Sequence, residues 1–278
     1  MKKFILLYGF QQLLLAAGAQ PYVDIFQFRY THAFRSQNNS SRGTPFNHFW
    51  AGSDIPLKLK EKTYLIFSPY FENWQIDSGS RENIVPSVKG LVLPVGLLIP
   101  ISSKWSWMIT PMVRTNGNQL FSGSTFQLGG ATFFSYEKSP GKKLRFGTYV
   151  NSDFFGFFIM PLLGADWRMN DRNYFFGLLP GRFTWEHQFN NHFYGGVTFR
   201  AITNSYRIQN DRYLRIDDNQ LSVFLEAYPA KRLCFTLEPG YGIQRKLRTG
   251  TAKRKYDNAD NWGDGFFIKL SAGYRMRF

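Results

Sequence analysis

The sequence predicts an all-β protein, a transmembrane antiparallel up-and-down β-barrel of about 14 strands. Segments of about ten residues alternate between apolar and polar side chains, as strands do when their two faces meet different surroundings. The connections between these segments alternate between short and long, and the chain ends in a strand whose last residue is Phe278. Together these features indicate an outer-membrane barrel, with tight turns at one end and long loops at the other.

The composition favours strands and excludes several other classes. The 278 residues include 29 Phe and 15 Tyr, and 34 Lys and Arg stand against 19 Asp and Glu. Aromatic residues are enriched in strands, so a helical bundle is not expected. The single cysteine, Cys234, excludes an internal disulfide and a Cys-based zinc site. No apolar run in residues 20–278 approaches the roughly 20 residues of a spanning helix, which excludes a helical inner-membrane protein.

Residues 1–19 have the features of a secretory signal peptide. Lys2 and Lys3 precede an apolar stretch that ends near Leu15, and a small-x-small sequence closes at Ala19. We expect cleavage after Ala19, which leaves residues 20–278 as a single barrel domain.

Alternation is clearest between Leu233 and Gln244, where Leu233, Phe235 and Leu237 fall on one face and Thr236 and Glu238 on the other. Both ends of a bacterial barrel face the periplasm, so the number of strands is even. Twelve strands is the alternative, if residues 174–189 form one segment instead of two divided at Pro180-Gly181. The fourteen expected strands lie near 22–35, 46–57, 63–76, 87–100, 105–115, 125–136, 143–153, 159–168, 173–179, 182–189, 192–208, 220–228, 232–247 and 263–278.

The last strand carries the most specific signal. It places Ser271, Gly273, Met276 and Phe278 in the order polar-x-Gly-x-x-hydrophobic-x-aromatic. This order looks like the signal by which the barrel-assembly machinery recognises outer-membrane proteins. We therefore expect that machinery to be a partner.

Three stretches carry a resemblance to a known family: PLLGADW at 161–167, GLLPG at 177–181 and FRAITNSY at 199–206. Through them the chain resembles the uncharacterised outer-membrane β-barrel proteins of Bacteroidota that are known only as a domain of unknown function. The resemblance implies the barrel fold and a location in the outer membrane of a Gram-negative bacterium. It implies no activity.

Charged residues on the polar faces of the strands are expected to point into the lumen, since Arg or Lys facing lipid near the midplane costs roughly 2 to 4 kcal/mol. They form either a transverse field across an aqueous pore that favours anions, or an ion-pair network that stiffens a blocked barrel. The candidate pore-lining residues are Arg29, Glu72, Arg114, Arg145, Glu186, Arg200, Glu226, Glu238, Lys269 and Arg275.

A basic outer loop is expected near the end of the chain. Its nearest partners are outer-membrane lipid and lipopolysaccharide, although a protein partner at the outer loops is an alternative. The expected location excludes nucleic acid. The loop residues are Arg245, Lys246, Arg248, Lys253, Arg254 and Lys255.

We expect no enzyme, no metal and no cofactor. Outer-membrane lipid hydrolases pair a Ser with a His in a His-x-Ser-Asn run, which is absent here. His187 and His192 flank a short turn, where histidines are commoner as turn residues than as metal ligands.

The expected function is a porin-like passive channel for small polar or anionic solutes. The alternatives are a non-conducting structural or accessory barrel of an outer-membrane assembly and, second, a lipid-modifying enzyme.

Overall fold

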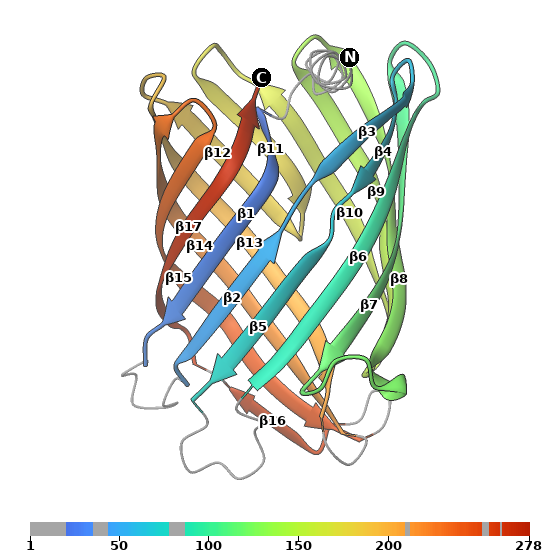
Figure 1. Ribbon diagram of the computed structural model, residues 1–278, viewed down its shortest axis with the longest axis vertical. Coiled ribbons are helices and arrows are strands. Elements are labelled where there is room, and N and C mark those ends of the chain that lie inside the picture. The colour runs from blue at the N-terminus through green and yellow to red at the C-terminus, as the bar shows by residue number, and fades with distance from the viewer. Residues whose placement is uncertain (1–20, 36–43, 78–86, 209–211, 252–255, 262) are drawn as a thin grey trace, which may run out of the picture.

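The computed structural model describes residues 21–35, 44–77, 87–208, 212–251, 256–261 and 263–278. These residues form one antiparallel sheet that closes into a barrel (Figure 1). The expected signal peptide lies outside them. None of the described residues forms a helix long and apolar enough to cross a membrane. The elements are β1 (Tyr22–Ala33), β2 (Phe46–Gly52), β3 (Ile55–Lys60), β4 (Thr63–Phe67), β5 (Tyr70–Ile76), β6 (Ser87–Pro100), β7 (Trp105–Gly117), the 3-10 turn η1 (Gly123–Thr125), β8 (Phe126–Ser139), β9 (Lys142–Asp153), β10 (Gly156–Arg168), β11 (Asn173–Leu179), β12 (Arg182–Gln188), β13 (Phe193–Arg207), β14 (Tyr213–Ala230), β15 (Leu233–Gly250), β16 (Asn258–Asn261) and β17 (Gly265–Arg277).

The wall has 14 strands, because three pairs of segments, β2 with β3, β4 with β5 and β16 with β17, each continue one strand across a short irregularity. Neighbouring strands are antiparallel, and β17 pairs with β1 from Tyr22↔Arg277 to Ala33↔Phe267, which closes the circle. The prediction of fourteen strands is confirmed. The alternative of twelve is wrong, because β11 and β12 are separate strands that pair with each other across the turn at 180–181.

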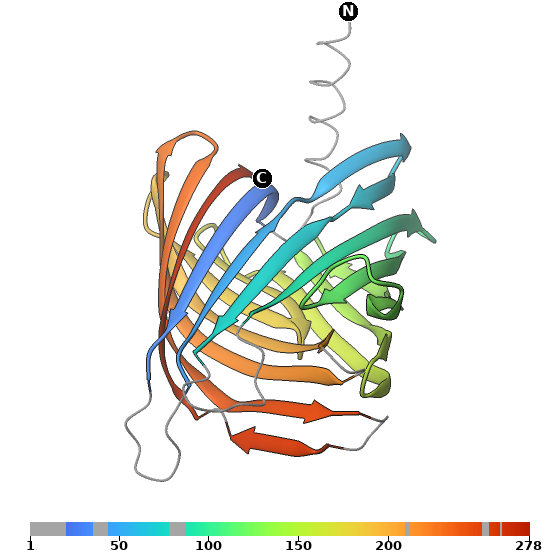
Figure 2. The same ribbon diagram turned by 60° about the horizontal axis from the view of Figure 1, so that its bottom comes forward.

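Both ends of the described chain lie at one end of the barrel, which we call the terminal end (Figure 1). The opposite end, where β1 leads toward β2, is called the loop end. The strands slant steeply between the two ends (Figure 2). β11 and β12 have 7 residues each, whereas their neighbours β10 and β13 have 13 and 15. The β11–β12 hairpin therefore turns back well before it reaches the loop end.

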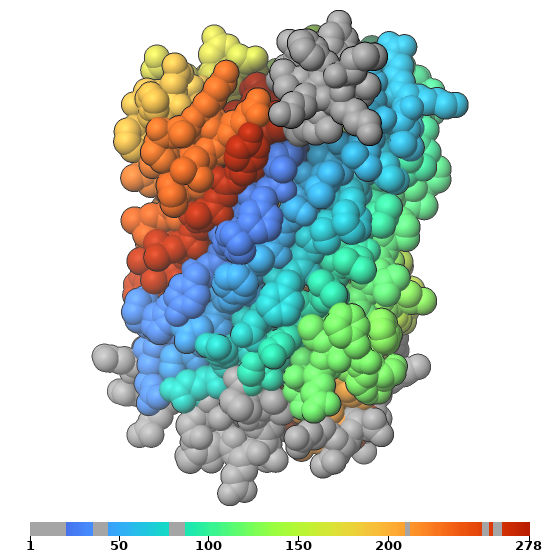
Figure 3. All heavy atoms as spheres, in the orientation of Figure 1, coloured from blue at the N-terminus to red at the C-terminus, as the bar shows by residue number. Residues whose placement is uncertain are grey.

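The barrel carries apolar side chains outside and polar ones inside, the reverse of a soluble protein. On the outer face Leu128, Leu163 and Phe266 are 65%, 65% and 69% exposed. Inside, Glu72 and Arg275 are buried. On the face formed by β1, β2, β5 and β6, side chains fill the space between strands, and the wall is continuous (Figure 3).

Two strands are longer than expected toward the loop end. β14 begins at Tyr213 instead of 220, because its residues 213–219 pair with the end of β13, as in Tyr213↔Arg207 and Asn219↔Ala201. β15 likewise runs to Gly250. Ladder hydrogen bonds join backbone groups, so a polar sequence can extend a strand beyond its apolar band.

Candidate functional site in the barrel lumen

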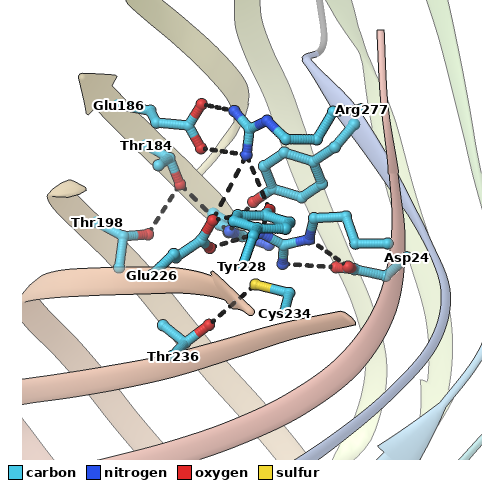
Figure 4. Close-up of polar contacts among 12 residues, drawn as sticks. Asp24, Thr184, Glu186, Thr198, Glu226, Tyr228, Cys234, Thr236 and Arg277 are labelled. Atoms are coloured by element: carbon cyan, nitrogen blue, oxygen red, sulfur yellow. Dashed lines mark hydrogen bonds and ion pairs between the residues drawn. The ribbon is translucent and has the colours of Figure 1, made fainter. Parts of the chain in front are cut away.

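At the terminal end, two arginines of β17 hold charges from three other strands together (Figure 4). Arg275 donates to Asp24 of β1 at 2.5 Å and to Glu226 of β14 at 2.5 Å. Arg277 pairs with Glu186 of β12 and with Glu226 at 3.5 Å. We call these five residues the terminal cluster. Because every charge in it has an opposite partner, the cluster joins β1, β12, β14 and β17 without leaving a free ion.

A further ion pair lies in the lumen, nearer the loop end than the terminal cluster. Glu238 of β15 stands directly opposite Lys269 of β17, and the two side chains are 2.6 Å apart. Ser222 donates to the same carboxylate at 2.6 Å. Lys269 is therefore held by a carboxylate, as a buried cation normally is.

At the loop end, the last residues of β13 cross the lumen to the opposite wall. Asn204 and Tyr206 donate to Glu72 of β5 at 2.9 and 2.8 Å. Ser205 donates to Asp153 of β9 at 2.7 Å, and Arg207 pairs in parallel with Gly117 at the end of β7. Strands that are far apart around the barrel thus meet here.

An apolar cluster fills the space that this crossing leaves. Its members come from the loop-end parts of β1, β2, β5, β6, β13, β14, β15 and β17 and their flanking residues, and all are nearly or fully buried. Together with the crossing of β13 it forms what we call the loop-end seal. The cluster consists of Ala33, Phe46, Trp74, Ile76, Val88, Tyr206, Ile208, Leu214, Ile216, Leu247 and Phe267.

Three arginines in the middle of the lumen stand apart from these pairs. Arg182 of β12 and Arg200 of β13 lie directly opposite each other in the ladder. Arg29 of β1 packs its guanidinium on the ring of Trp50 at 3.8 Å. None of the three makes an ion pair with a described residue, and the buried Nε atoms of Arg29 and Arg200 have no acceptor among them. We call Arg29, Arg182 and Arg200 the arginine trio.

Like charges directly opposite across a ladder are destabilising. Arg182 is held by Tyr22 at 2.9 Å and by Thr184 at 3.2 Å, which are neutral acceptors. The trio therefore concentrates positive charge for which no described carboxylate is a direct ion-pair partner, although Glu238 lies near enough to attract Arg200. An anion placed between the guanidinium groups would supply the missing partner.

The trio borders a cavity of about 550 Å³. This volume lies within the roughly 300 to 1,000 Å³ of small-molecule sites. Its polar side includes Arg29, Arg182, Arg200, Gln220 and Lys269. Its apolar side, from β10, β11 and the turn that follows, includes Phe158, Met160, Leu162, Phe176, Leu178 and Pro180.

The structure places the expected pore-lining residues on the inside of the wall but divides them into separate groups. Glu186, Glu226 and Arg275 belong to the terminal cluster, and Glu238 pairs with Lys269. Glu72 and Arg114 lie at the loop-end seal, where Arg114 pairs with Asp153 at 2.5 Å. Arg145 pairs with Asp166. Of the six basic residues among the ten, only Arg29 and Arg200 lack a carboxylate partner among the described residues.

Arg182 belongs beside these two residues. It opens the expected strand 182–189, but the alternation of that strand was followed only from Phe183 onward, so Arg182 was not among the pore-lining candidates. The inward face of β12 holds Thr184 and Glu186. Extending that alternation back by two residues would have found Arg182.

The expected basic outer loop is wrong for its first three residues. Arg245, Lys246 and Arg248 lie in β15 instead. A bulge between Ile243 and Lys246, with Gln244 at φ 53°, shifts the alternation by one residue and turns Arg245 inward. Arg245 is 2% exposed and bonds to Asp218 at 2.8 Å. The remaining loop residues, Lys253, Arg254 and Lys255, lie outside the described part of the chain.

The residues of the C-terminal signal lie on the last strand and its end. Ser271 and Gly273 face inward opposite Arg29 and Gln27, and Met276 lies opposite Val23. The amide of Phe278 donates to the carbonyl of Pro21 at 2.9 Å.

Three of the histidines each contact a different partner. His48 lies 3.1 Å from Glu72 and stacks on Trp74, while His187 and His192 bond to Asn173 and to the carbonyl of Tyr228. Among the described residues, no group of three His, Cys, Asp or Glu side chains could hold a metal ion.

Comparisons with known proteins agree with the fold. A family model described as "Domain of unknown function (DUF6268)" matches residues 65–277. No curated protein matches the chain. Among solved structures, the COG4313 outer membrane channel from Pseudomonas putida F1 has a TM-score of 0.51 at 8% identity, over 93% of this chain and 97% of that one. The NanC porin has a TM-score of 0.40 at 8% identity, over 90% and 100% of the two chains. The toluene transporter TodX from Pseudomonas putida has a TM-score of 0.38 at 10% identity, over 95% and 91%.

Proposed function

The chain belongs to the DUF6268 family, whose description names no activity, and from the geometry of its lumen we propose that it is an outer-membrane channel that binds and passes small anionic solutes. It works without a cofactor and catalyses no reaction. The apolar outer face supports a place in a membrane, since water would not tolerate so many exposed Leu and Phe side chains. The fold shared with the COG4313 channel supports the outer membrane of a Gram-negative bacterium.

The observation that carries this proposal is the arginine trio beside the cavity. The fully buried arginines described here, Arg114, Arg245 and Arg275, are each matched by a carboxylate, whereas the half-buried arginines of the trio are not. A barrel stabilised only by ion pairs would not need Arg182 opposite Arg200. A passing anion is the partner that their charge favours.

The orientation follows from the general rule that both ends of a bacterial barrel chain face the periplasm. The terminal end then faces the periplasm and the loop end faces outside. Residues 1–19 would direct export, and Ser271, Gly273, Met276 and Phe278 would be read by the assembly machinery. Lys246, which is exposed near the loop end, is then placed to meet the phosphates of lipopolysaccharide.

Conductance of the refolded barrel, residues 20–278, in a planar bilayer under a KCl gradient tests the proposal. We expect a reversal potential that indicates anion selectivity, and Arg200→Gln should move it toward zero. Arg168→Gln is the matched control, because Arg168 is exposed at the terminal end and pairs only with Asp171 there among the described residues.

The loop-end seal favours a second candidate, a non-conducting accessory barrel. A barrel that is folded but silent in the bilayer, and binds no anion, would support this candidate and reject the channel.

A further inference from the structure

The barrel wall is incomplete between β10 and β13. The first pair between β10 and β11 is Leu163↔Leu179, and the last between β12 and β13 is Arg182↔Arg200. Toward the loop end, residues 156–162 of β10 and 202–206 of β13 thus have no ladder partner on the edges that face each other, within the described residues. We call this opening the wall gap.

The wall gap is bounded on all sides. The turn of the β11–β12 hairpin limits it toward the terminal end, where the amide of Ala201 donates to the carbonyl of Gly181 at 2.9 Å. The β9–β10 turn limits it toward the loop end, where the amide of Phe154 donates to Ser205 at 3.1 Å. Arg207 lies over the Phe154 ring at 4.4 Å.

Strand geometry gives the size of the wall gap. Two missing strands leave three spacings of about 4.8 Å, or about 14 Å, beside the hairpin turn. Residues 156–162 extend about 20 Å along β10. The gap then narrows toward the loop end, where β13 approaches the β9–β10 turn. Measured between backbones, a space of this size is wide enough for a hydrocarbon chain but not for a folded domain.

The cavity reaches the wall gap. Phe158 and Met160 from one edge, Gly181 from the turn, and Ile202 and Thr203 from the other edge all line it. The arginine trio lines the same cavity farther inside. One continuous space therefore connects the opening in the wall with the uncompensated positive charge.

The outward-facing side chains beside the wall gap are apolar on β10 and become polar along β13. On the outer face of β10, Phe157 and Ile159 are 64% and 62% exposed, as lipid-facing side chains are. On β13 the outward positions change from the apolar Phe199 to Thr203. An unpaired strand edge is tolerated at membrane depth only where it lines a cavity. The gap therefore lies at the outer boundary of the apolar belt, where amphiphiles concentrate.

We propose that the wall gap is a lateral port, and that the ligand is a single-chain amphiphile with a carboxylate head group. The arginine trio binds the head group, while Phe158, Met160 and Leu162 contact the chain. The loop-end seal narrows the direct route from outside, so the amphiphile exchanges with the membrane through the wall. This inference rests on the anion-binding role proposed above and adds the substrate class and the route.

Cysteine labelling in phosphatidylcholine vesicles tests the port. In a Cys234→Ser background, Met160→Cys places a thiol on the inner face of the gap edge. Met108→Cys is the matched control, because Met108 faces the lumen from β7, where the wall is paired on both sides as Leu98↔Met108 and Met108↔Phe133. The reagents are dodecylmaleimide, which resides in the bilayer, and a charged, water-soluble maleimide. Leu162→Cys replaces Met160→Cys if that variant does not fold, as judged by circular dichroism.

We expect dodecylmaleimide to label Met160→Cys at least tenfold faster than Met108→Cys. Dodecanoate should protect the thiol, whereas acetate and dodecanol should not, and Arg200→Gln should remove the protection. Equal labelling of the two thiols, with anion selectivity intact, would overturn the port alone. Protection that survives Arg200→Gln would overturn the head-group assignment. Protection by phosphatidylglycerol vesicles without dodecanoate would make a membrane lipid the ligand and overturn the carboxylate.

Discussion

Neutralising Arg200 should stabilise the barrel, although Arg200 is a partly buried cation inside it. Arg200→Gln removes a charge that lies opposite Arg182 and has no hydrogen bond or ion pair with any described residue. The Cβ atoms of directly opposed residues are about 4.5 to 5.5 Å apart, and we take about 7 Å between the two guanidinium groups at the ends of these longer side chains. At an effective dielectric constant of about 20, two unit charges at that distance repel by about 2.4 kcal/mol.

Salt and a neighbouring carboxylate reduce this figure. Screening with a Debye length of about 8 Å lowers the repulsion to about 1 kcal/mol. Glu238 attracts Arg200 as well, although its carboxylate is bonded to Lys269 at 2.6 Å. We therefore expect Arg200→Gln to raise the free energy of unfolding by about 0.5 to 1 kcal/mol in 0.15 M salt.

The assay is equilibrium unfolding of the refolded barrel in lipid vesicles, followed by tryptophan fluorescence over a guanidinium-free denaturant series. In about 1 M KCl, where the Debye length is about 3 Å, the gain should nearly vanish. Arg275→Gln is the control, and it should change the free energy of unfolding in the opposite direction. Arg275→Gln leaves Asp24 without its cation and leaves Glu226 only its 3.5 Å contact with Arg277, so it should cost about 3 to 5 kcal/mol. A loss of stability for Arg200→Gln that does not depend on salt would refute an uncompensated arginine trio.

Three other substitutions test separate parts of the structure. Arg245→Leu should cost about 3 to 5 kcal/mol in the same unfolding assay, because Asp218 would be buried without its cation. Lys246→Leu is the control and should change stability by less than about 0.5 kcal/mol. Equal losses of stability for the two variants would contradict the bulge that turns Arg245 inward. Leu128→Arg should cost about 2 to 4 kcal/mol in vesicles if this position faces the bilayer midplane, and a neutral effect would place it outside the lipid. Tyr206→Ala should loosen the loop-end seal and raise single-channel conductance, and unchanged conductance would show that the seal does not limit the current.

The sequence predicted the strands well because each has two faces in opposite surroundings. That contrast produced the alternation of Leu233, Phe235 and Leu237 with Thr236 and Glu238, and their exposures follow it. It could not locate the bulge at Gln244, because a residue other than Gly at positive φ leaves no mark in the hydropathy pattern. It also placed the start of β14 at 220, seven residues late, because polar strand residues beyond the apolar band look like a loop.

The candidate site was only partly predictable. Alternation identifies which charges point inward, but not which of them find a partner on a strand distant in sequence. Asp153 reaches Ser205 only because β13 crosses the lumen. The short β11–β12 hairpin was expected, yet the wall gap depends on the ladder register of the strands around it. The register depends on how neighbouring strands pair in the closed barrel, so the sequence of a single strand does not determine it.

The terminal cluster also favours one register between the first and last strands, where the barrel closes. Asp24 and Arg275 stand opposite each other in the seam between the first and last strands, 251 residues apart in the chain. A seam that slipped by two residues would keep every side chain on its proper face, so hydropathy alone would accept it. A slip that brought Gly273 opposite Asp24 would, however, separate Asp24 from Arg275 and leave this carboxylate without its cation. The salt bridge thus rejects a misregistered seam that the apolar surface cannot distinguish from the correct one.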